Sequence, residues 1–166
     1  MKQEAYFFED DGITPNSPYP VIVMPQVCKG EDLENIFPDT FKKNNWGNNW
    51  LDIILNKDHY HSTTHEVLGI CKGEVNLKIG GEQGKIFHLV AGDAIIIPAG
   101  VGHFSIDTTA DYLVAGGYPN GNNWDMIYNE PEKYEAAKQS IGLLPMPALH
   151  PVSGEPFTVF IKNNQA

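Results

Sequence analysis

Short apolar runs, interrupted at close intervals by glycine and proline, dominate residues 50–119. The runs LDIIL, HYH, EVLGIC, EVNLKIG, KIFHLV, AIIIP, HFSID and DYLVAGGY follow one another, separated by turn residues such as Gly73, Gly84 and Gly92. Glycine adopts the left-handed backbone of tight turns, and proline lacks the backbone donor that a central strand needs. Strands this short and this regularly interrupted predict an all-β sandwich or a small barrel.

Length and composition indicate one folded domain over residues 1–166. Hydrophobic residues make up 42% of the chain, which is enough for a substantial packed core. We expect the barrel core at about residues 50–119. The N-terminal arm, residues 1–49, and a C-terminal helix with an apolar tail, residues 120–166, are expected to pack on this barrel or on a partner subunit.

Two segments outside the core have helical patterns. In residues 31–45 apolar side chains recur at helical spacing, and Pro38 is expected to divide the segment into two short helices. Residues 131–140 begin with a proline, which suits the first turn of a helix, and predict a helix near the C-terminus. Between these segments, Trp46 and Trp50 bracket Gly-Asn-Asn, which predicts a turn.

The formal net charge of −10, from 11 basic and 21 acidic residues, argues against two classes of partner. A field of this sign repels nucleic acid and anionic membrane surfaces, so we expect neither as a partner. Cys28 and Cys71 form no CxxC or zinc-ribbon pattern; a disulfide between them stays open, but two thiols in a reduced protein are the simpler interpretation. The acidic N-terminal segment and the lack of an apolar run of about 20 residues predict a soluble, cytoplasmic protein.

Three histidines and one glutamate are the candidate metal-ligating residues. His59 and His61 are two residues apart, so on a β-strand both side chains project from the same face. Glu66 begins the apolar run EVLGIC, whose alternate residues are expected to share one face. Two imidazoles and a carboxylate directed into a barrel are costly unless they are paired or hold a metal. A further histidine, His103, leaves the turn PAGVG and would complete a set of three nitrogens and one carboxylate.

These residues lie in two gapped motifs that resemble the cupin signatures HxHx4Ex6G and Gx5PxGxxH. The matching residues are His59, His61, Glu66 and Gly73 in the first motif and Gly92, Pro98, Gly100 and His103 in the second. Asp107 stands where the second motif often ends in asparagine, a structural position that leaves the four ligands intact. The flanking segments WGNNW, HSTTHEVLG and GGYPNGNNWDM resemble the YjlB-like branch of the cupins, which brings no established reaction.

The resemblance implies a double-stranded β-helix, a jelly-roll barrel with a few short peripheral helices. It also implies that His59, His61, Glu66 and His103 bind one divalent transition metal, with iron, manganese, nickel, zinc and copper all open. Three neutral imidazoles and one carboxylate would leave such an ion one net positive charge. In an octahedron they would also leave two positions for a small oxygenated ligand.

The main hypothesis is a metal-dependent enzyme that acts on a small organic substrate, by oxygenase, isomerase or lyase chemistry such as decarboxylation. The alternative is a non-enzymatic metal-bound cupin that binds or senses a small ligand. In a third interpretation the chain is a structural dimer module built on the arms 1–27 and 141–166; dimerisation of this kind is common among cupins, and we expect a homodimer. No catalytic residue beyond the metal ligands is identified.

The remaining histidines and aromatic residues are assigned mainly structural roles. His65 is expected in the turn or on the outer face of the barrel, with a role beside the metal ligands or the substrate as the alternative. We expect His88 in the core or on the surface, and His150 in the packing of the tail. The aromatic side chains expected at lids and core edges, one of which could border the barrel mouth, are Trp46, Trp50, Tyr118 and Trp124.

Overall fold

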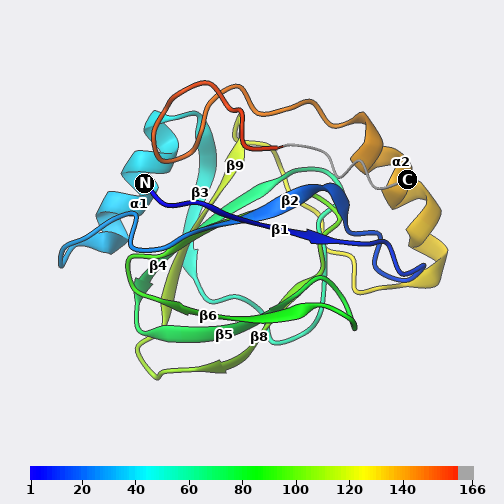
Figure 1. Ribbon diagram of the computed structural model, residues 1–166, viewed down its shortest axis with the longest axis horizontal. Helices are drawn as coiled ribbons and strands as arrows, with labels where there is room; N and C mark the ends of the chain where they lie inside the picture. Colours follow the sequence, from blue (N-terminus) through cyan, green and yellow to red (C-terminus); the bar gives the residue numbers. More distant parts are fainter. Residues whose placement is uncertain (161–166) are drawn as a thin grey trace.

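The computed structural model describes residues 1–160, whose strands form two antiparallel sheets that face each other (Figure 1). The six-stranded sheet contains, in spatial order, β1 (Glu4–Phe8), β2 (Ser17–Met24), β7 (Ala94–Ile97), β4 (Glu66–Lys72), β9 (Leu113–Pro119) and β3 (Trp46–Asp52). The three-stranded sheet contains β6 (Lys85–Val90), β5 (Glu74–Ile79) and β8 (His103–Thr108). From β4 onward the chain crosses repeatedly between the sheets, which is the winding of a double-stranded β-helix. The predicted all-β fold is confirmed.

Apolar side chains from alternate positions of each strand fill the space between the sheets. In β4, Leu68 and Ile70 belong to this core, whereas Val67 and Cys71 lie on the outer face, as the alternation in the sequence predicts. The outer face is covered as well, so the central strands β4 and β7 are buried on both sides. This double burial explains why β7 is apolar and buried at every position.

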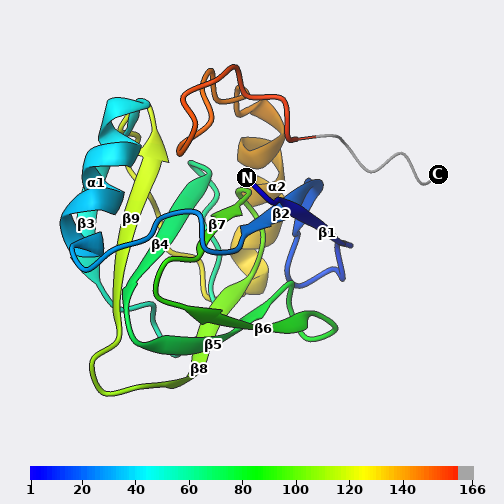
Figure 2. The same ribbon diagram turned by 60° about the vertical axis from the view of Figure 1, so that its left-hand side comes forward.

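The outer face of the six-stranded sheet is covered by α1 (Leu33–Lys43), which lies against β3, β4 and β9 (Figure 2). The prediction of two helices divided at Pro38 is wrong, because a single helix continues through this residue. Phe37 and Phe41, on either side of the proline, are fully buried against the sheet. Their burial, about 1.5–3 kcal/mol for each side chain, together offsets the roughly 3 kcal/mol cost of an internal proline.

The expected turn between Trp46 and Trp50 is also wrong, because both residues belong to β3, an edge strand paired with β9. The pairing register shifts within this segment, where one extra residue forms a bulge. The Asn49 side chain donates to two backbone carbonyls there and holds the bulge in place. The strand expected at residues 51–55 accordingly ends at Asp52.

The chain beyond β9 returns over the outside of the barrel. A 3-10 turn, η1 (Pro131–Lys133), leads into α2 (Tyr134–Leu143), so the predicted helix is present and extends to Leu143. The tail then packs on the same outer face as α1, where the Trp46 indole donates to the Leu149 carbonyl and Phe160 is buried. No helix within residues 1–160 is long and apolar enough to cross a membrane.

Gly69 of β4 marks a close approach between the six-stranded sheet and α1. A Cβ atom at this position would lie 2.5 Å from the ring of Phe37, which is itself fully buried. We therefore expect Gly69→Ala to lower the free energy of unfolding by about 1–3 kcal/mol, as an overpacked core does. Gly142→Ala in α2 is the matched control, because a Cβ there meets no atom within 4 Å. Urea unfolding measures both variants, and equal stability of the two would contradict this packing.

Candidate metal centre

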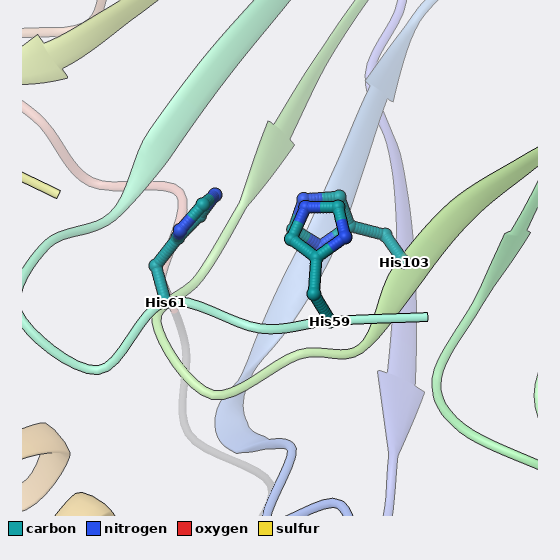
Figure 3. Close-up of side chains that lie close together, drawn as sticks. All are labelled: His59, His61 and His103. Carbon is teal, nitrogen blue, oxygen red and sulfur yellow. The ribbon is translucent and has the colours of Figure 1, made fainter. Parts of the chain in front are cut away.

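Three histidine rings converge inside the barrel, at the end where β8 begins (Figure 3). His103 is the first residue of β8, and His59 pairs with it in an isolated antiparallel bridge. The strand expected at residues 59–61 is therefore reduced to isolated bridges at His59 and Tyr60, and His61 follows directly after them. One ligand nitrogen from each ring lies within 4.8 Å of the others, and all three residues are buried. The three rings can hold one metal ion.

Each ring is oriented by a hydrogen bond between its Nδ1 atom and a backbone carbonyl. The distances are 2.8 Å for His59, 2.5 Å for His61 and 3.0 Å for His103, and the carbonyls belong to Lys57, Asp125 and Val101 respectively. A carbonyl can only accept, so Nδ1 carries a proton in all three rings. In the neutral tautomer Nε2 then presents a lone pair to the centre of the site, as in metal-binding histidines.

Glu66, the first residue of β4, places its carboxylate beside the same nitrogen atoms. Its oxygens lie 3.5 Å from Nε2 of His61 and 3.4 Å from Nε2 of His103. Neighbouring ligands about 2.1 Å from a common ion are about 3.0 Å apart in an octahedron and about 3.4 Å apart in a tetrahedron, so these distances fit a shared ion. Tyr118 donates to Oε2 of Glu66 at 2.9 Å and accepts from the Trp50 indole at 2.8 Å, which orients the carboxylate.

The buried Glu66 carboxylate needs a positive charge beside it. Burial alone would raise the pKa of Glu66, but His61 and His103 stand beside the carboxylate and lower it below its ordinary value. For His61, burial opposes protonation, but Glu66 and Asp125 outweigh it and raise the pKa of the imidazole. Burial, reinforced by His103, lowers the pKa of His59 to about 3. A metal ion at the centre would take the place of the proton on His61.

Asp125, which the sequence does not single out, links His61 to the turn that follows it. Its carboxylate accepts hydrogen bonds from the backbone N–H and the hydroxyl of Ser62, at 2.7 and 2.5 Å, and from the N–H of Thr63 at 3.2 Å. Partial burial opposes ionisation, but these donors keep the pKa of Asp125 below its ordinary value. Asp125 lies 64 residues beyond His61, and no spacing pattern in the sequence connects the two.

A cavity of about 470 Å³ lies above the four candidate ligands, all of which line it. One side is formed by β3 and residues 53–55, and another side by Trp124 and Met126. Small-molecule sites in proteins have volumes of roughly 300–1,000 Å³, and this cavity falls within that range. The aromatic residues expected at lids and core edges that do line the cavity are Trp50, Tyr118 and Trp124.

The other histidines and the cysteines lie outside this cavity. His65 is buried on the outer face of the six-stranded sheet, so its position does not support a role beside the substrate. His88 is exposed on β6, and His150 accepts two backbone N–H groups within the tail, as expected for tail packing. Cys28 and Cys71 are both free thiols.

No family model matches the chain. The chain is 38% identical over 154 residues to YjlB of Bacillus subtilis (strain 168), and the alignment covers 92% of this chain and 91% of the relative. Among solved structures, the 3,4-ketoisomerase QdtA from Thermoanaerobacterium thermosaccharolyticum is 17% identical, with a TM-score of 0.45, over 57% of this chain and 74% of that chain. Acireductone dioxygenase from Bacillus anthracis, with a cadmium ion in its active centre, is 16% identical, with a TM-score of 0.43, over 76% of this chain and 83% of that chain. Neither similarity bears on the reaction.

Two facing sheets wound as a double-stranded β-helix, with three histidines and a glutamate gathered at one end, define a cupin. At 38% identity over nearly its whole length, the chain belongs to the YjlB family of cupins. The resemblance predicted from the two gapped motifs and their flanks is thus confirmed.

Burial lowers the pKa of His65 to about 4, and this shift makes stability depend on pH. Because the folded pKa lies below the unfolded value, the neutral ring stabilises the fold above about pH 6.5, and this contribution is lost as the pH falls through 4. The loss is on the order of 3 kcal/mol. We expect the stability difference between wild type and His65→Gln, from urea unfolding, to shrink between pH 7 and pH 4.

The exposed Gln83 provides a control without an ionisable side chain, and Gln83→Ala should show no comparable trend. Nδ1 of His65 accepts the N–H of Ala99 at 2.9 Å, so glutamine retains an acceptor at this position. A stability difference that stays constant from pH 7 to pH 4 would contradict a buried neutral imidazole.

Proposed function

We propose that this cupin is a metal-dependent enzyme on a small organic molecule, with His59, His61, Glu66 and His103 as ligands of one divalent transition metal. The proposal depends above all on the three bonds from Nδ1 to backbone carbonyls, which direct three Nε2 lone pairs toward one point. Packing alone does not require three buried imidazoles to share this orientation, whereas a common cation does. The neighbouring Glu66 carboxylate supports the same interpretation.

The donor atoms limit the choice of ion. Imidazole nitrogen and carboxylate oxygen suit iron, manganese, nickel, zinc and copper. A divalent metal bound there would supply Lewis-acid polarisation of an oxygenated substrate, or dioxygen activation if it is iron. The chain itself orients the imidazoles through backbone carbonyls, orients Glu66 through Tyr118, and keeps the pKa of Glu66 low through His61 and His103. Oxygenase, isomerase and lyase reactions are all compatible with this arrangement.

A non-enzymatic cupin that binds a small ligand at its metal is the second candidate function. Apart from the four proposed ligands, the titratable side chains among the described residues that line the cavity are Asp52 and Tyr118. Burial, together with Glu66, raises the pKa of Tyr118 far above its ordinary value, so this phenol does not exchange a proton readily. The scarcity of acid–base groups favours the binding function, and the roomy cavity favours the enzyme.

Metal analysis of the untagged native protein tests the proposed ligands. We expect plasma mass spectrometry to find about one transition-metal ion per chain in the wild type, and almost none in His61→Ala and His103→Ala, because each variant removes one of the few ligands. His88→Ala is the matched control, since His88 is exposed and lies outside the cavity. Circular dichroism verifies that all variants fold.

A wild type that contains no metal and takes up none when iron, manganese or zinc is added would contradict the proposed centre. With the metal in place, a panel of small hydroxy and oxo acids separates the two functions. Turnover of any of them supports the enzyme, and binding without turnover across the panel supports the binding function.

Asp125→Ala tests whether the residue that clamps the 62–63 turn also positions His61. The variant keeps the backbone carbonyl that accepts from His61 and removes only the carboxylate that binds Ser62 and Thr63, so we expect metal affinity to fall severalfold because this carbonyl is held less firmly. Competition with a chromophoric chelator measures this affinity. Asp39→Ala, at an exposed position of α1, should leave the affinity unchanged. An Asp125→Ala variant with wild-type affinity would show that the turn does not position the ring.

A further inference from the structure

The cavity above the proposed metal centre has a largely apolar lining. Ile54 and Leu68, both almost fully buried, form part of its interior. The apolar side chains that stay exposed at its rim are Ile53, Leu55 and Trp124, at 55%, 38% and 46% exposure. Exposed apolar surface around a concave site favours an apolar ligand, because the ligand removes this surface from water.

The charged side chains in the lining are acidic. In the described part of the chain they are the exposed Asp52 and the buried Glu66. All 11 basic residues of the sequence are lysines, and none of those that the structure describes lines the cavity. Lys57 is the lysine nearest in sequence to the histidines, and its Nζ atom lies over the ring of Tyr128, 4.3 Å from the ring centre. A phosphate or second carboxylate on a ligand would therefore lose water without gaining a counter-ion.

Several neutral donors of the lining are already engaged within the protein. The Asn49 amide donates to two backbone carbonyls, and the Asn48 amide donates to a third. The Trp50 indole donates to Tyr118, whose hydroxyl donates to Glu66. These groups could stabilise an anionic substituent only by giving up existing hydrogen bonds, which reduces any gain in affinity.

We propose that the cavity selects a small, largely apolar molecule with one anionic metal-chelating group, such as a 2-oxo carboxylate, and no second negative charge. The inference rests on the proposed metal centre, where three neutral imidazoles and one carboxylate leave a divalent ion one net positive charge. A single anionic chelating group neutralises this charge. The apolar tail of the ligand lies against the rim residues Ile53, Leu55 and Trp124, which determine specificity.

Two 2-oxo acids of nearly the same shape test the charge preference. Their chelating ends are identical, but 5-methyl-2-oxohexanoate ends in an isopropyl group and 2-oxoglutarate in a carboxylate. Each is titrated by calorimetry into wild-type protein loaded with Co²⁺, and the metal content is measured before and after. We expect 5-methyl-2-oxohexanoate to bind at least about tenfold more tightly. Equal affinity, tighter binding of 2-oxoglutarate, or binding of neither to the loaded protein would overturn the inference.

A rim variant tests the specificity residues. Ile53→Lys places a cation at a side chain that is 55% exposed, so the core is left intact. We expect this variant to reduce the preference for 5-methyl-2-oxohexanoate severalfold. Ile106→Lys, at a 42% exposed position of β8 outside the cavity, should retain the wild-type preference. An unchanged preference in Ile53→Lys would overturn the role of the rim.

The measured metal content distinguishes a failure of the proposed ligand preference from a failure of the proposed metal centre. A wild-type protein that contains no transition metal and takes up none when iron, manganese, zinc or Co²⁺ is added would overturn the metal centre itself. A protein that retains the metal but shows no preference between the two acids would overturn only the substrate class.

Discussion

The buried Glu66 carboxylate is the constraint on which the interior of this barrel depends. At 3% exposure it requires compensating charge and hydrogen-bond donors, because an isolated buried carboxylate is strongly unfavourable. His61 and His103 lie beside the carboxylate and supply the positive charge. Tyr118, which accepts from the Trp50 indole, donates a hydrogen bond to the carboxylate. The same groups that make the charge tolerable in the fold also hold it where a cation would bind.

Two residues that are adjacent in the sequence lie on opposite faces of the six-stranded sheet, one in the candidate metal centre and one in the outer packing layer. Glu66 points into the barrel, while the preceding His65 lies on the opposite face with Tyr19 and Phe160. Successive side chains of a strand point to opposite faces, so two adjacent titratable residues occupy different environments. Glu66 is held ionised among polar partners, whereas the pKa of His65 is lowered by burial among aromatic rings.

Two local predictions failed where aromatic side chains find partners far along the chain. Pro38 does not divide α1, because Phe37 packs against Gly69, where any larger side chain would collide with the ring. The segment around Trp50 is a bulged strand rather than a turn, because its indole fits closely over Gly116 of β9. Helix and turn propensities are weak local preferences, and burial of a large aromatic ring outweighs them.

The sequence by itself determined the strand periodicity and the all-β class, because these follow from spacing along short stretches of backbone. It also indicated His59, His61, Glu66 and His103 as candidate ligands, through their resemblance to the two cupin motifs. Only the tertiary structure decided how the candidates are held and what lies above them. Asp125 contacts His61 from 64 residues further along the chain. The described lining of the cavity, which contains no lysine, likewise combines groups from distant parts of the chain. Hydrogen bonds and cavities depend on atomic positions in space, which spacing in one dimension does not specify.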